Sequence, residues 1–289
     1  MSSKALTTEG KEIFPLEIGY LPQFAVKKCE EELNETPEGK MRGIQELRSL
    51  LQRNLKIKGI DFYDDFLVAY LRRNKYRVKD AQQQILNLIH FHERENVFGG
   101  VPDEYLDLPS SQYLVLLPMR CQDACALFLC RWGKWDPTEL PFERLKKILA
   151  MEVSQALRDP MTQINGFKII HDLEGLSFKQ MKYCTPNNLL LFYNGTVNCV
   201  PARYKELHVI SESSVVKIIW RIFKPMLSEK IKGRVHFHNN TEELFDYFPR
   251  GIMPTEYGGD SREADMKDWI RRANKEQEKF TLRGQPNCY

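Results

Sequence analysis

The sequence has no long apolar run and no secretory segment. No stretch approaches the ~18 consecutive apolar residues of a membrane-spanning helix. The N-terminal stretch MSSKALTTEGKEIFPLEIGY lacks the apolar core of a signal peptide. The seven cysteines are scattered and odd in number, which argues against a disulfide framework. With 42% hydrophobic and 28% charged residues, the chain is expected to be a folded cytoplasmic protein with reduced thiols.

The motifs of several enzyme classes are also missing. The chain has no glycine-rich phosphate loop, no G-x-S-x-G elbow and no complete set of metal ligands, although His236 and His238 share one predicted strand face. His171-Asp172 resembles a catalytic pair, but no activated nucleophile lies near it in the sequence. We therefore expect no catalytic residue, no metal and no cofactor.

Positive charge is concentrated in one segment. The formal net charge is +3, yet Arg203 to Arg234 alone contains eight Lys or Arg residues against three Glu, a local balance of +5. No zinc-finger spacing or basic repeat accompanies it. A basic segment rich in apolar residues favours an anionic membrane surface over a nucleic acid as the partner.

Residues 22–97 read as helical, with the 3–4 spacing of amphipathic helices at 40–54 and 78–96 and a helix capped by Asp61 at 61–73. A Gly-Gly and Pro-rich break near residue 99 separates this region from a different pattern. Short β-rich runs at 113–118, 126–132, 166–172, 204–210 and 234–238 then alternate with helical stretches at 141–158, 178–194 and 213–232. This alternation predicts an α/β layer with a mainly parallel sheet.

The stretch 213–232 has an unusually wide apolar arc. On one continuous helix, Lys217, Arg221, Lys224 and Ser228 would form a narrow polar stripe, and apolar residues would cover roughly 200°. Such a helix is either buried between two layers or is a lid that covers an apolar cavity and turns its other side toward lipid. The pattern alone leaves both interpretations open.

Four segments together resemble the CRAL-TRIO family of lipid carriers, which includes tocopherol-transfer and retinaldehyde-binding proteins. They are LRRNKYRVKDA from Leu71, NGFKIIHDLEGLS from Asn165, RYKELHVIS with WRIFKPMLSEKIKGRVHFHNN from Arg203, and IMPTEYGGD from Ile252. The resemblance implies an N-terminal helical module (1–98), a lipid-binding domain (99–260) whose sheet is the floor of an apolar pocket under a mobile gate helix, and a C-terminal tail (261–289).

The resemblance also implies roles for individual residues. The expected lipid pocket comprises Leu149, Val153, Phe167, Ile169, His171, Phe192, Leu207 and Val209. The gate helix contributes Val216, Ile219, Phe223 and Leu227, and a phosphoinositide headgroup is expected at Arg203, Lys205, Lys230 and Arg234.

Two departures from the family pattern affect these roles. Asn74 replaces the second arginine of the family's LRAR signature, with Arg73 beside it, and His171 places a polar ring where an aromatic hydrocarbon is expected. A monomeric carrier of tocopherol, a retinoid, a carotenoid or a similar isoprenoid lipid, peripherally associated with phosphoinositide membranes, is the leading hypothesis. A phosphoinositide-recruited sensor or adaptor in membrane trafficking is the alternative, and an enzyme acting on lipids has the least support.

Overall fold

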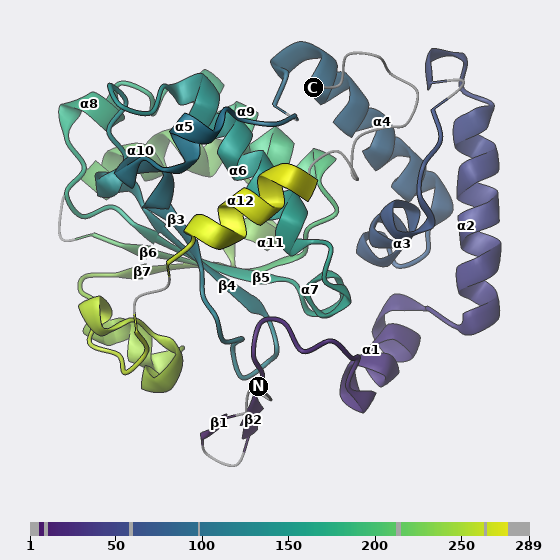
Figure 1. Cartoon of the computed structure of the whole chain (residues 1–289), viewed down its shortest axis with the longest axis horizontal. Helices are drawn as coiled ribbons and strands as arrows, with labels where there is room; N and C mark the ends of the chain where they lie inside the picture. Colours follow the sequence, from purple (N-terminus) through teal and green to yellow (C-terminus); the bar gives the residue numbers. More distant parts are fainter. Residues whose placement is uncertain are drawn as a thin grey trace.

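The computed structural model describes residues 6–8, 11–57, 60–97, 99–211, 215–262 and 265–276. A five-stranded sheet lies at its centre, with helices above it and beside it in Figure 1. The strand order is β3-β4-β5-β6-β7, with β3 antiparallel to β4 and the remaining pairs parallel. The strands are β3 (Leu114–Leu116), β4 (Ala126–Arg131), β5 (Phe167–Asp172), β6 (Tyr204–Ile210) and β7 (Val235–His238). Each lies within a predicted β-rich run, and the α/β class is confirmed.

The N-terminal module is helical, as predicted, and lies beside the sheet (Figure 1). Its helices are α1 (Gln23–Leu33), α2 (Pro37–Gln52), α3 (Asp64–Arg73) and α4 (Val78–Glu95). The Thr36 hydroxyl caps α2 by accepting a hydrogen bond from the Gly39 N–H at 3.0 Å. The predicted cap of α3 was wrong, because that helix begins three residues beyond Asp61, whose carboxylate instead pairs with Arg48 at 3.3 Å. A short hairpin of β1 (Leu6–Thr8) and β2 (Lys11–Ile13) precedes these helices and was not predicted.

Further helices surround the sheet in the described residues from 99 onward. They are α5 (Asp103–Leu106), α6 (Phe142–Ala156), α7 (Pro160–Asn165), α8 (Phe178–Met181), α9 (Pro186–Tyr193), α10 (Val215–Phe223), α11 (Glu229–Lys232) and α12 (Lys267–Glu276). The predicted helix 178–194 is two helices, because Thr185 caps a new one at Pro186. No helix in the described ranges is long and apolar enough to cross a membrane.

One face of the sheet is sealed by the segment after β7, which folds as the short turns η6 (Glu242–Asp246), η7 (Arg250–Ile252) and η8 (Thr255–Tyr257). The Phe248 ring packs edge-on against His208, with ring centroids 4.7 Å apart. The Tyr257 hydroxyl donates a hydrogen bond to the Asp172 carboxylate at 2.5 Å, and Glu256 pairs with Arg131 at 2.7 Å. The family-like segments around Asp172 and Tyr257 therefore hold each other across this face.

The C-terminal tail contains a helix, α12, which packs against the rest of the chain. Ile270 and Ala273 are buried, and Arg271 pairs with Asp107 at 2.6 Å. The Asn274 amide accepts from the Val101 N–H at 2.9 Å and donates to the Val101 carbonyl at 3.0 Å. In Figure 1, α12 lies over α6, on the helical side of the sheet. Residues 277–289 lie outside the described residues.

Buried polar contacts connect the N-terminal module to the rest of the chain. Arg72 forms two hydrogen bonds with the Glu35 carboxylate, both at 2.7 Å, and a third with Gln163 on α7, also at 2.7 Å. Asn74 donates to Gln84 at 2.7 Å, and Gln84 in turn donates to the Val200 carbonyl at 2.8 Å. Unlike an arginine, Asn74 here acts as a short internal bridge between helices.

We expect Glu35→Gln to destabilise the protein by about 3 kcal/mol at neutral pH, because it leaves the Arg72 charge buried without its partner. Burial alone would raise the pKa of Glu35, but the hydrogen bond and charge of Arg72 outweigh burial and hold this pKa below its usual value. The stabilisation is therefore present above the carboxyl's unfolded pKa of about 4.3 and is lost as the pH falls through the lower folded pKa.

Urea unfolding of wild type and Glu35→Gln across pH measures this difference. The control is Glu31→Gln, because Glu31 forms an exposed pair with Lys27 at 3.6 Å, which should contribute less than about 1 kcal/mol. A Glu35→Gln effect as small as that of the control would show that the buried pair does not stabilise the fold.

Candidate functional site: an apolar chamber beside a cationic cluster

The two faces of the sheet are covered unequally. Ile170, His208 and Ile210, which point toward the η6–η8 side, have no exposed side-chain surface. Side chains alternate along a strand, so Ile169, His171, Leu207 and Val209 point to the opposite, helical side. All four of these are only partly buried, although β5 and β6 are interior strands. The structure therefore has an apolar floor that the helices above it do not fully cover.

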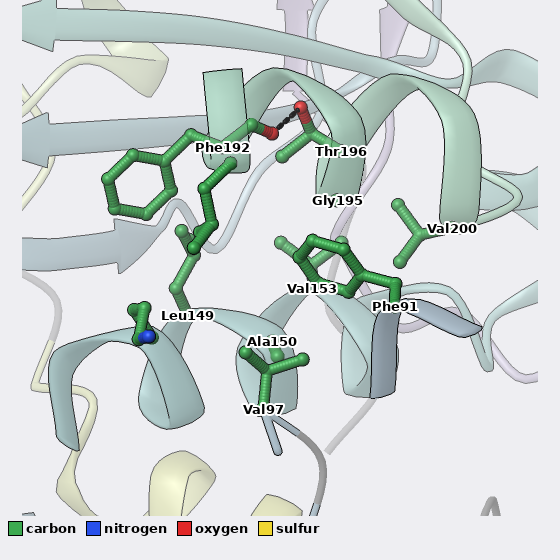
Figure 2. A pocket seen from close by; sticks show the side chains of 11 residues that line it. Phe91, Val97, Leu149, Ala150, Val153, Phe192, Gly195, Thr196 and Val200 are labelled. Atoms are coloured by element: carbon green, nitrogen blue, oxygen red, sulfur yellow. Dashed lines mark hydrogen bonds between the residues drawn. The ribbon is translucent and has the colours of Figure 1, made fainter. Parts of the chain in front are cut away.

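A cavity lies between α4, α6, α9 and the π turn η4 (Asn194–Cys199) (Figure 2), and its lining includes none of the four floor residues. We call this cavity and the half-covered floor together the apolar chamber. Three predicted pocket residues, Leu149, Val153 and Phe192, line it from two different helices. Its remaining lining is also mostly apolar and comprises Phe91, Val97, Lys146, Ala150, Leu191, Gly195, Thr196 and Val200. The Thr196 hydroxyl donates to the Phe192 carbonyl at 2.6 Å, so it presents no free donor to the cavity (Figure 2).

The volume of this cavity is about 40 Å³. That volume holds on the order of three water molecules. A lipid of isoprenoid size would need these walls to move apart or would occupy additional space above the floor.

The remaining predicted pocket residues lie on β5 and β6. Ile169 is paired in register with Leu207, and His171 with Val209, so these four side chains form one patch. Phe167 shares their strand face but is fully buried, with its ring 5.1 Å from that of Phe128. It belongs to the packed core under one end of the floor.

Helices α9 and α10 cover the floor loosely. No residue of α9 is buried, and Leu190 is 43% exposed. On α10, Val216, Ile219 and Phe223 are partly buried, whereas Ile218 is 49% exposed. The ring of Trp220 meets that of Phe237 on β7 at 5.1 Å, and Phe223 meets Tyr193 on α9 at 6.4 Å. The helix thus has apolar side chains on both its inner and its outer side.

The prediction of one continuous helix over 213–232 was wrong. Helix α10 ends at Phe223, the turn η5 (Lys224–Met226) follows, and α11 begins at Glu229. Pro225 explains the break, because proline has no N–H and its ring clashes with the carbonyl four residues earlier. Leu227, predicted on the gate helix, is instead a buried residue between the two helices. Ser228 caps α11 rather than extending a polar stripe, and residues 212–214 lie outside the described residues.

The four residues predicted for a headgroup gather near the start of β6 and β7. Arg203 donates to the Ile164 carbonyl at 2.5 Å, and Arg234 donates to the Tyr204 carbonyl. A β-bulge falls at Lys205, since Phe167 pairs with Tyr204 but Lys168 pairs with Glu206. Bulges re-aim side chains beside functional sites. Lys230, on α11, is exposed.

Arg73 joins this group, although the sequence comparison with the LRAR pattern left its role in doubt. Burial lowers the pKa of Arg73, and the neighbouring charges of Arg203 and Arg234 lower it further. The Nε atom of Arg73 is buried and has no hydrogen-bond partner among the described residues. We call Arg73, Arg203, Lys205, Lys230 and Arg234 the cationic cluster.

The cluster is poorly compensated by acids. Burial lowers the pKa values of Arg203 and Lys205, and mutual repulsion among the cations adds to the effect. For Lys230, the charge of Arg234 is the largest cause of a lowered pKa. Glu32 lies 3.8 Å from Arg203. Lowered pKa values on basic groups mean that their charge destabilises the folded state, a common feature of binding sites for anions.

We therefore expect Arg73→Met to stabilise the protein by about 1 kcal/mol, because it removes a repelled, partly desolvated charge and keeps the aliphatic stem. Thermal unfolding at low ionic strength measures the change. The control is Arg77→Met, since Arg77 is exposed and paired with Asp80, and it should leave stability nearly unchanged. Equal or lower stability of Arg73→Met would contradict the repulsion argument.

Comparisons with known proteins agree with this architecture. The CRAL/TRIO domain family matches residues 110–259. The human protein named "Alpha-tocopherol transfer protein-like" is 30% identical over 86% of this chain and 74% of its own length. The rat protein named "Clavesin-1" is 27% identical over 89% of this chain and 73% of its own length.

A solved structure, that of Sfh5, has a TM-score of 0.46 at 10% identity and covers 87% of this chain and 92% of its own. The family match spans more than half of the residues and includes the whole five-stranded sheet and helices α6, α9, α10 and α11. This chain belongs to the CRAL-TRIO family of lipid-binding and lipid-transfer proteins.

Proposed function

We propose that this protein carries one hydrophobic lipid, held between the half-covered floor of the sheet and helices α6, α9 and α10, and transfers it at phosphoinositide-containing membranes. The observation that supports this most is the incomplete cover over Ile169, Leu207 and Val209, in contrast to the sealed opposite face. Covering an exposed apolar surface of this kind with an apolar molecule lowers the free energy, because the surface is removed from water.

The chemistry of the chamber favours an isoprenoid lipid such as a tocopherol, a retinoid or a carotenoid. Its walls and floor are built from aliphatic and aromatic side chains on α6, α9, β5 and β6. Each methylene of a ligand buried there contributes roughly 0.8 kcal/mol. The name of the human relative includes tocopherol transfer, which is consistent with this class of ligand.

Helix α10 is suited to act as the gate. It is nine residues long, and the break at Pro225 separates it from α11, so it can move without displacing β7. Its inner residues Ile219 and Phe223 would close over the lipid, and its outer residue Ile218 would face the membrane when the gate opens.

The inner and outer residues of α10 give a matched test. Ile219→Asp should weaken binding of the hydrocarbon fluorophore diphenylhexatriene in solution by at least about tenfold, because a carboxylate is costly in an apolar chamber. Ile218→Asp, one residue away on the exposed side, should leave this binding near that of wild type.

Fluorescence titration of the purified variants gives both affinities. Equal binding by Ile219→Asp and wild type would rule out the chamber under α10 as the lipid site.

The cationic cluster would recruit the protein to phosphoinositide membranes. Its members lie where α11 returns to the sheet, so an anionic headgroup there would contact both the gate segment and the starts of β6 and β7. A headgroup that binds the open state more tightly must, by linkage, favour opening and lipid exchange. Arginine suits such a contact because its planar fork pairs phosphate oxygens two at a time.

Lys205 and Lys230 allow this membrane role to be tested without removing backbone contacts, because the hydrogen bonds to carbonyls come from Arg203 and Arg234. Lys205→Gln with Lys230→Gln should weaken binding to phosphatidylcholine vesicles containing phosphatidylinositol bisphosphate by about 10- to 30-fold. Raising the salt concentration should reduce the wild-type affinity in the same way.

Vesicle co-sedimentation and the rate of lipid transfer between vesicles are the measurements. Arg42→Gln with Lys267→Gln, two exposed cations elsewhere, removes the same net charge and serves as the control. Equal losses in both double variants would show that total charge, and not the cluster, determines membrane binding. Tight vesicle binding by wild type without accelerated transfer would favour the sensor or adaptor function instead.

A further inference from the structure

His171 is a polar residue in the otherwise apolar floor. It lies at the end of β5, in register with Val209 on one side and Cys130 on the other. Its ring lies nearly parallel to the indole of Trp132, with centroids 6.2 Å apart and an interplanar angle of 19°. Trp132 in turn contacts Phe192, a lining residue of the cavity in Figure 2, with ring centroids 6.4 Å apart.

The contact with Trp132 determines which ring nitrogen of His171 carries the proton. The Trp132 indole N–H lies 3.1 Å from His171 Nδ1. An indole nitrogen can only donate, so Nδ1 must accept and cannot carry a proton. A neutral imidazole must then carry its proton on Nε2, which makes Nε2 a hydrogen-bond donor.

The ring is neutral at physiological pH. Burial lowers the pKa of His171 to about 4, although the residue is not completely buried. The neighbouring Asp172 does not offset this effect, because its carboxylate receives the Tyr257 hydroxyl on the other side of the sheet. His171 thus offers an uncharged donor, suited to an uncharged acceptor.

Within the described part of the chain, His171 forms one side-chain hydrogen bond. It accepts this bond from Trp132 through Nδ1. Of the side chains beside it, Ile169 and Val209 have no acceptor atom, and Cys130 has only a thiol sulfur, which is a weak acceptor. An apolar ligand without an acceptor would bury the Nε2–H with no partner, at a cost in affinity. A ligand with a well-placed oxygen would satisfy it.

We propose that His171 is a specificity-determining residue whose Nε2–H selects hydrophobic ligands with a neutral oxygen acceptor, such as a carbonyl, ether or hydroxyl group, over pure hydrocarbons. Trp132 is a positioning residue in this arrangement, since it fixes the tautomer and the plane of the ring. This inference rests on the proposed carrier function, because it requires a ligand above the floor.

A matched pair of ligands tests the selection. Methyl pentadecyl ketone and heptadecane have the same number of carbons, and only the ketone has an acceptor. Displacement of diphenylhexatriene gives the affinity of each, and the ketone-to-alkane ratio is compared between variants so that differences in water solubility cancel. We expect His171→Phe to reduce this ratio by about 3- to 10-fold relative to wild type. His90→Phe, the same substitution at an exposed histidine on α4, should keep the wild-type ratio.

The outcomes separate the two proposals. If wild type does not bind diphenylhexatriene at all, the carrier function fails, and the role of His171 fails with it. The fluorophore could instead bind while wild type and His171→Phe have the same ketone-to-alkane affinity ratio. That result would support the chamber as the lipid site and overturn selection by His171.

A second measurement does not depend on a substitution at His171. In ¹⁵N spectra of the histidine rings, wild-type His171 should be the neutral tautomer protonated on Nε2, and adding the ketone, but not the alkane, should shift the Nε2 resonance. Trp132→Phe should allow the Nδ1-protonated tautomer to appear. A wild-type ring protonated on Nδ1, or an Nε2 signal that does not respond to the ketone, would overturn the proposal.

Discussion

The unequal cover of strands β5 and β6 is the constraint on which the rest of the structure depends. On one face, Phe248 packs on His208 and the Tyr257 hydroxyl donates a hydrogen bond to Asp172, so the segment after β7 covers and stabilises this face. On the other face, partly buried Leu207 and Val209 lie under helices with few buried residues. Because the sealed face stabilises the sheet, the elements above it can separate locally without global unfolding.

The chain path links the chamber to the cationic cluster. Strand β6 begins beside Arg203 and leads into α10, which crosses back over the sheet and returns through α11 to Arg234 and β7 (Figure 1). The gate segment therefore ends where the cations gather. The break at Pro225 divides this path into a cover over the floor and a short basic helix near the cluster. Because the turn at Pro225 joins α10 to α11, a headgroup bound beside α11 would lie on the same segment as the cover over the floor, which is the arrangement that coupling between lipid and headgroup requires.

The sequence predicted the strands well because each is a short run of β-branched and aromatic residues between turn signals. It failed at 213–232, where a count of apolar spacing ignores the missing N–H of Pro225. The position of Arg73 near Arg203 and Arg234 could not be predicted, because these residues are far apart in the chain and come together only in the folded structure, where α3 packs against α7. The tautomer of His171 could not be predicted either, since it depends on a hydrogen bond from Trp132, which lies on another element. Local pattern determines elements, whereas the chemistry of the site depends on long-range contacts.

Both ends of the proposed site contain polar groups that the fold does not satisfy. In the part of the chain that the structure describes, Arg73 Nε of the cationic cluster and the neighbouring Tyr204 hydroxyl are buried without partners, and the one hydrogen bond of His171 uses Nδ1. Unsatisfied donors and repelled charges reduce the stability of a folded protein, so the surrounding structure must hold them in place. A ligand that supplies the missing acceptor or anion removes this cost and stabilises the folded state in proportion to its binding. An oxygen-bearing lipid at His171 and an anionic headgroup at the cationic cluster would each supply such a partner.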